Sequence, residues 1–242
     1  MNLLTPSILV GYDTAVKERL AMMRESISGE RLAMQGRSEV FADDLIAWSI
    51  ALTGRFERPL IDAAAAQYRM ALLAIALGWY RLAFFSLRLF LELALGSIYY
   101  STREFEYRKW ASGELDSSWT AFTSPDSGPL SKAHVRMFLE PLAEESANYR
   151  EIACKAYREC SEYVHGNMLT HIADSPLAFQ GALFEKWHTL ADAAALATSY
   201  ALAARYTPIL SPAALVPLES ALLSQLGHIS AIRDFFDREV ER

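Results

Sequence analysis

Residues 70–100 read MALLAIALGWYRLAFFSLRLFLELALGSIYY, the most membrane-like stretch of the 242-residue chain. Arg81, Arg88 and Glu92 interrupt it at intervals far shorter than the roughly 20 apolar residues that span a bilayer. Gly78 divides the stretch, and the residues on either side are apolar on nearly every helical face, which is typical of buried helices. We therefore expect two central helices of a soluble bundle that meet at Gly78, and no membrane span.

The remainder of the chain has the same helical character. Hydrophobic residues make up 52% of the sequence and charged residues 21%, as in a globular protein, and only eleven glycines occur. Apolar residues recur with helical spacing, and strand-like alternation is nearly absent. The predicted fold class is therefore all-α, an antiparallel helical bundle in a single domain over residues 1–242. The expected helices cover residues 14–28, 38–52, 59–77, 79–109, a stretch beginning near 131, and then 141–165, 175–206 and 218–240.

Residues 111–131, ASGELDSSWTAFTSPDSGPLS, form the clearest predicted loop, because Ser, Asp, Gly and Pro dominate them. A connection of this length is long for a compact domain, and such loops often carry function or fold over a site.

The charge of the chain is uneven. A formal net charge of −6 gives the whole molecule no general attraction for nucleic acid. Residues 67–110 are nevertheless locally basic, with six Arg or Lys residues against three Glu. Phosphate contact and an acidic partner chain are both compatible with that stretch.

Cysteine usage and the first residues bear on location. On a helix, the spacing of Cys154 and Cys160 points them in different directions, so neither a disulfide nor a metal pair is expected. The opening residues MNLLTPSILVGYD lack the positive segment of a signal peptide. Both observations favour a reduced, cytoplasmic setting.

Familiar catalytic signatures are missing from the sequence. It contains no Gly-rich phosphate loop, no Gly-x-Ser-x-Gly elbow and no Cys-x-x-Cys pair. The five histidines never fall at i, i+4 spacing, and none accompanies a carboxylate in the zinc-protease pattern. We therefore predict no cofactor and no metal.

One segment carries a suggestive charged pair. Residues 157–168 read YRECSEYVHGNM, in which Arg158 and His165 lie seven positions apart. Seven residues advance a helix by about two turns, so both side chains project from one face, roughly 10 Å apart along the axis. An ordinary solvated face, with Arg158 paired to Glu162 by an ion pair, accounts for the same spacing. The opposite stripe, expected to pack on the core, comprises Tyr149, Ile152, Ala153, Ala156, Cys160 and Val164.

The segment from Arg158 to His165 resembles the Arg-x4–6-His motif of the HEPN superfamily, small all-α domains found in toxin, defence and RNA-processing proteins. Its end, SEYVHG (161–166), is similar to the form that the motif takes in several HEPN groups. The upstream stretch SLRLFLELALGSIYYSTREFEYRKWASGE (86–114) resembles the Leu-Arg-x-x-Leu-Glu helix that precedes the motif. The resemblance covers a HEPN-like core of about residues 60–170, flanked by helical extensions at 1–59 and 171–242.

The resemblance implies a metal-independent endoribonuclease, a toxin or phage-defence effector. HEPN nucleases usually form homodimers in which two motifs face each other, so Arg158 and His165 of both chains would make one composite catalytic site. Histidine can act as base or acid at cellular pH, and arginine matches phosphate oxygens. Ser161, Asn167 and Arg88 would be auxiliary or RNA-binding groups. Asn167 can instead end the helix after Gly166.

Two further points belong to this interpretation. Arg88 has a structural alternative, an i, i+4 ion pair with Glu92. Glu159 follows Arg158 where many active HEPN nucleases carry Asn, Asp or His.

Two other functions remain open. The first is a non-catalytic HEPN-like module that binds RNA, nucleotide or a partner protein such as an antitoxin, which Glu159 would favour. The second is a bundle used only for assembly, with the 111–131 loop as its docking surface.

Overall fold

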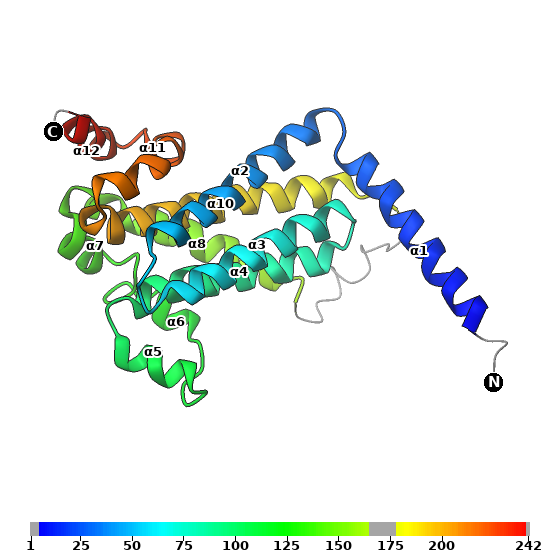
Figure 1. Ribbon diagram of the computed structural model, residues 1–242, viewed down its shortest axis with the longest axis horizontal. Helices are drawn as coiled ribbons and strands as arrows, with labels where there is room; N and C mark the ends of the chain where they lie inside the picture. Colours follow the sequence, from blue (N-terminus) through cyan, green and yellow to red (C-terminus); the bar gives the residue numbers. More distant parts are fainter. Residues whose placement is uncertain (1–4, 165–177, 241–242) are drawn as a thin grey trace.

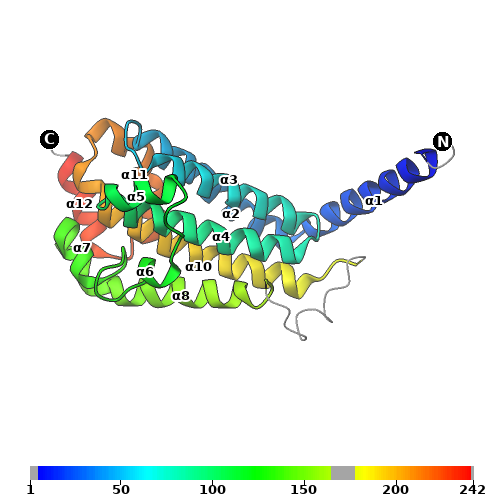
Figure 2. The same ribbon diagram turned by 90° about the horizontal axis from the view of Figure 1, so that it is seen from below.

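The computed structural model describes residues 5–164 and 178–240, and within these residues every regular element is a helix. Five long helices run alternately up and down the molecule, as Figures 1 and 2 show. They are α2 (Glu30–Ala51), α3 (Arg58–Ala76), α4 (Tyr80–Tyr100), α8 (Ser146–Ser161) and α10 (Gly181–Tyr206). The predicted all-α bundle is confirmed.

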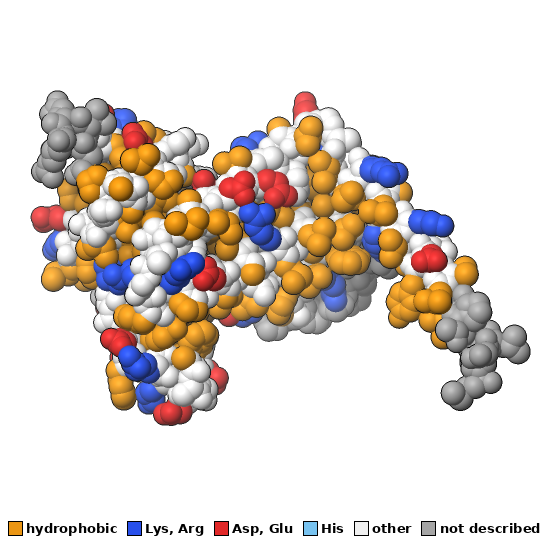
Figure 3. Space-filling view, in the orientation of Figure 1, with side chains coloured by type: hydrophobic (Ala, Val, Ile, Leu, Met, Phe, Trp, Pro, Cys, Tyr) orange, Lys and Arg blue, Asp and Glu red, His pale blue; other side chains and the backbone are white. Residues whose placement is uncertain are grey.

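Shorter elements surround one end of the bundle. They are α5 (Glu104–Ala111), α6 (Trp119–Phe122), α7 (Lys132–Leu139), η1 (Glu140–Glu145), η2 (Thr207–Ile209), α11 (Pro212–Leu226) and α12 (Ser230–Val240). At the other end, α1 (Thr5–Ser26) projects away from the body (Figure 2). Apolar side chains are exposed along it, including Ile8, Tyr12 and Val16, and the space-filling view shows them continuing onto the bundle (Figure 3).

The core consists of two hydrophobic clusters, one towards each end of the bundle. Each of the five long helices contributes side chains to both clusters. Among the described residues, α4 is the one helix that is long and apolar enough to cross a membrane, judged by length and composition alone. Of its apolar 18-residue segment, 61% is buried inside the protein. Most of α4 therefore belongs to the core, while Leu82 and Phe85 of α4 and Met70 and Leu73 of α3 are exposed.

The expected break at Gly78 is a helix-capping turn. Gly78 adopts a positive φ of 70° after the last turn of α3. The amide of Trp79 donates to the carbonyl of Ala74 at 2.8 Å, and the amide of Gly78 donates to that of Ile75 at 3.1 Å. This is the Schellman arrangement, which favours glycine because other residues are strained at positive φ. A Cβ at Gly78 would also collide with the Met22 side chain of α1.

The single helix expected over residues 79–109 is wrong: α4 ends at Tyr100 and α5 begins at Glu104. Arg205 of α10, 7% exposed, donates from Nε to the Ser101 hydroxyl at 2.8 Å and from Nη2 to the Ser101 carbonyl at 3.4 Å. The last backbone carbonyls of a helix have no N–H donor within the helix, and the Arg205 guanidinium supplies one for the Ser101 carbonyl. The break thus coincides with a contact to a residue 104 positions away in the sequence.

The helix expected over 218–240 is also divided, into α11 and α12. At Gly227 the backbone turns so tightly that a Cβ would collide with the Leu223 carbonyl. The start of the expected 141–165 helix is the 3₁₀ helix η1, and α8 begins at Ser146.

Candidate functional site

The two segments that carry the HEPN resemblance lie against each other. Helix α4 packs on α8, and the Arg88 Nε donates to the Ser161 hydroxyl at 3.1 Å. Two of the predicted auxiliary residues, 73 positions apart, therefore form one local site. The Ser161 hydroxyl in turn donates to the Tyr157 carbonyl at 2.8 Å, within α8.

Arg88 belongs to a closed hydrogen-bond network. Its guanidinium pairs with Glu92 at 3.1 Å and donates to the Tyr157 hydroxyl, which donates to Glu92 Oε1 at 2.7 Å. The side chains of Arg88 and Glu92 are 22% and 18% exposed, so water screens their charges only partly. Burial, and then the hydrogen bond to Glu92, raise the pKa of Tyr157 to about 12. Tyr157 therefore stays protonated and links the two charges.

The 111–131 segment folds over this network. Within it, Ser118 caps the four-residue helix α6 by accepting from the Ala121 amide at 3.3 Å. The Trp119 ring stacks on Tyr157 with 3.8 Å between the ring centroids and 8° between the planes. Phe122 is buried against Gly96 of α4. This segment therefore contacts α8 at Tyr157 and α4 at Gly96.

Arg158 lies on the outer side of α8 and is exposed. Its neighbour Glu159 lies on the side of α8 that faces α10 and forms an ion pair there with Lys186 at 3.3 Å. Of the stripe predicted to face the core, Tyr149, Ala153, Ala156 and Cys160 are buried, whereas Ile152 and Val164 are only partly buried. Burial raises the pKa of the Cys160 thiol to about 12, and neither it nor Cys154 is in a disulfide.

Two of the five predicted site residues, His165 and Asn167, lie outside the described residues. Of the other three, Arg88 and Ser161 are in contact, and Arg158 follows Tyr157 on the outer face of α8. The structural alternative for Arg88, an ion pair with Glu92, is confirmed. A phosphate would have to compete with that carboxylate for the guanidinium.

The locally basic stretch 67–110 is partly neutralised. Arg69 pairs with Asp43 of α2 at 2.7 Å, and Arg108 pairs with Glu104 at 2.6 Å. Together with the Arg88–Glu92 pair, these contacts match three of its positive charges with carboxylates. Over residues 5–164 and 178–240, no three His, Cys, Asp or Glu side chains gather closely enough to hold a metal ion.

Sequence reasoning did not identify Tyr157 and Trp119 as part of this site. One signal was present: Tyr157 lies four positions before Ser161 and immediately before Arg158, so it shares a helix face with Ser161. Nothing local indicated that Trp119 would stack on it.

Searches of protein-family models, of curated proteins and of solved structures each return no match for the chain. The HEPN resemblance therefore stays a prediction that rests on the two quoted segments.

Proposed function

We propose that the protein is a HEPN-like, metal-independent endoribonuclease, a cytoplasmic toxin or phage-defence effector that cleaves RNA at a homodimer interface. The supporting observation is the contact between Arg88 of the LRLFLE segment and Ser161 of the SEYVHG segment. The two stretches that resemble HEPN segments meet at a mostly buried polar network.

In this mechanism the nucleophile is the 2′-hydroxyl of the RNA. One His165 removes its proton, the 2′ oxygen forms a bond to phosphorus, and the bond from phosphorus to the 5′ oxygen breaks. His165 of the second copy gives a proton to the departing 5′ oxygen, which leaves a 2′,3′-cyclic phosphate and a 5′-hydroxyl. Arg158 of each copy contacts the non-bridging phosphoryl oxygens, whose negative charge its planar guanidinium matches.

Arg88, Glu92 and Tyr157 have a positioning role in this proposal. Their hydrogen bonds join the last turns of α8 to the middle of α4 and fix the rotation of α8 about its axis. That rotation determines which way Arg158 points. Asn167 is kept as an auxiliary RNA contact.

The test uses purified protein, end-labelled RNA and EDTA throughout. Wild type should cut RNA and leave 2′,3′-cyclic phosphate ends, and Arg158→Ala and His165→Ala should each cut at least about 100-fold more slowly. Arg136→Ala is the matched control, because Arg136 is an exposed arginine on α7. Activity per molecule should fall on dilution as the dimer dissociates.

Three results would count against the proposal. Equal cleavage by wild type and His165→Ala would identify a contaminating nuclease. RNA binding without cleavage would indicate the non-catalytic module. Loss of a protein complex on deleting residues 111–131, with RNA neither bound nor cut, would indicate the assembly function.

A further inference from the structure

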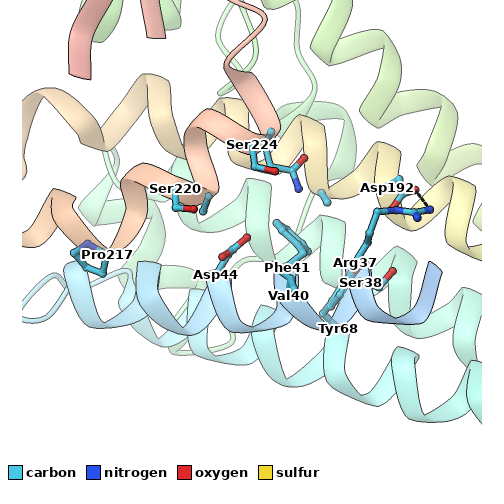
Figure 4. A pocket seen from close by; sticks show the side chains of 13 residues that line it. Arg37, Ser38, Val40, Phe41, Asp44, Tyr68, Asp192, Pro217, Ser220 and Ser224 are labelled. Atoms are coloured by element: carbon cyan, nitrogen blue, oxygen red, sulfur yellow. Dashed lines mark ion pairs between the residues drawn. The ribbon is translucent and has the colours of Figure 1, made fainter. Parts of the chain in front are cut away.

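A cleft of about 550 Å³ lies on the side of the bundle formed mainly by the terminal extensions (Figure 4). Helix α2 forms one wall and α11 the other, with α10 and Tyr68 of α3 between them. Its volume falls in the range of small-molecule sites, roughly 300–1,000 Å³. Apolar side chains, among them Val40, Phe41 and Pro217, line it together with polar groups.

The inner part of the cleft contains an unsatisfied polar group. Tyr68 is fully buried, and its hydroxyl lies near Ser38 without a well-formed hydrogen bond to any described residue. Ser38 beside it is 1% exposed, and its hydroxyl is bonded to His188 Nδ1 at 3.0 Å. A buried hydroxyl without a partner costs free energy, which a ligand in the cleft can recover by bonding to it.

The charges of the cleft are unbalanced. At one end Arg37 pairs with Asp192 at 3.5 Å, the contact drawn in Figure 4. Asp44 lies about two helical turns further along α2 and forms no ion pair with a described residue. Its neighbour Asp43 points outward and pairs with Arg69 at 2.7 Å. Asp44 therefore leaves an excess negative charge in a half-buried place.

Hydroxyl groups face this carboxylate from the opposite wall. Ser220 and Ser224 extend from α11 towards α2 at the level of Asp44, as Figure 4 shows. Such groups can accept the remaining N–H bonds of a bound ammonium. An anion would instead meet an uncompensated carboxylate, because Asp192 already neutralises Arg37.

We propose that this cleft binds a small organic ammonium compound, with its cationic nitrogen at Asp44 and a polar group of its body hydrogen-bonded to Tyr68. The site is separate from the proposed RNA-cleaving face, and it assigns a role to the terminal extensions, which lie outside the HEPN resemblance.

The experiment measures binding to the full chain by isothermal titration calorimetry at neutral pH. Tyramine, agmatine and 1,5-diaminopentane are the probes, and tyrosol is the neutral control, because it replaces the ammonium of tyramine with a hydroxyl. At least one amine should bind with a Kd below about 1 mM, and tyrosol should bind at least tenfold more weakly than tyramine if tyramine is that amine.

The variants distinguish a direct contact of the amine with Asp44 from a general attraction to the negative charge of the protein. Asp44→Asn should weaken amine binding at least tenfold and Tyr68→Phe about threefold, while Asp43→Asn should leave it unchanged. Thermal unfolding of each variant checks that it is folded. Binding of none of the three amines to wild type would overturn the proposal, as would equal losses in Asp43→Asn and Asp44→Asn. RNA cleavage by Asp44→Asn should equal that of wild type, so the two proposals fail independently.

Discussion

Acidification should destabilise this fold through its buried histidines, and His188 is the best place to measure the effect. His188 is 1% exposed, and its ring packs against Phe184 and Trp187. Burial, and then the positive charge of Arg37, lower the pKa of His188 from 6.5 to about 4. The fold therefore holds a neutral imidazole over a pH range in which the unfolded chain would bind a proton.

The sign and size of the effect follow from that difference. Above about pH 6.5 neither state is protonated, and the full stability is present. Between that pH and about 4 the unfolded state binds more protons, so the free energy of unfolding falls as the pH falls. From about pH 7 to about pH 5 the loss amounts to about 2 kcal/mol. His134, whose pKa burial and the nearby Arg205 lower to about 4, should add a similar loss.

The assay is urea unfolding followed by circular dichroism at both pH values, for wild type and His188→Gln. Burial, and then the neighbouring Asp43, raise the pKa of Asp44 to about 6, so acid stabilises the fold through that carboxyl and opposes the histidines. The Asp44 contribution is the same in both proteins. It therefore cancels when the decrease in the free energy of unfolding of the variant, from about pH 7 to about pH 5, is subtracted from that of wild type. The subtraction should leave about 2 kcal/mol. A remainder below about 0.5 kcal/mol would refute the reasoning, since the imidazole would then titrate equally in both states.

Two other substitutions test local contacts. Tyr157→Phe removes the hydroxyl that joins Arg88 to Glu92 and should lower the free energy of unfolding by about 1 kcal/mol at neutral pH, measured by urea unfolding. An unchanged value would mean that the hydrogen bonds of the Tyr157 hydroxyl to α4 do not contribute to stability. Gly78→Ala should lower it by more than Gly113→Ala, because both glycines have positive φ but a Cβ collides with another side chain only at Gly78. Equal losses of about 1 kcal/mol would show that α1 does not dock there.

Much of the fold could be predicted from local patterns. Apolar periodicity indicated the helices, Gly78 marked the end of α3, and the stripe from Tyr149 to Cys160 identified the buried face of α8. Contacts between a helix end and a distant residue could not be predicted. Arg205 bonds to Ser101 at the end of α4 from 104 positions away. Periodicity shows which face of a helix is buried but not which side chain of another helix contacts it.

In the candidate site too, contacts within one helix could be predicted and contacts between elements could not. The spacing of Arg88 and Glu92 predicted their ion pair, because both lie on one helix. The contact of Arg88 with Ser161, and the stacking of Trp119 on Tyr157, each join elements that pack only in the folded chain. The cleft between α2 and α11 had no local signal either, since its walls come from opposite ends of the sequence.

The two polar regions of the bundle differ in a way that indicates different roles. A buried polar group costs free energy unless it is hydrogen-bonded, so a complete network can serve the fold by itself. Around Arg88 the network is complete, because Glu92, Tyr157 and Ser161 satisfy one another and the guanidinium. In the cleft, no described residue forms an ion pair with Asp44 or a well-formed hydrogen bond with the Tyr68 hydroxyl, so the network is open there. The complete region is suited to hold α8 in place, and the open one is suited to take a ligand.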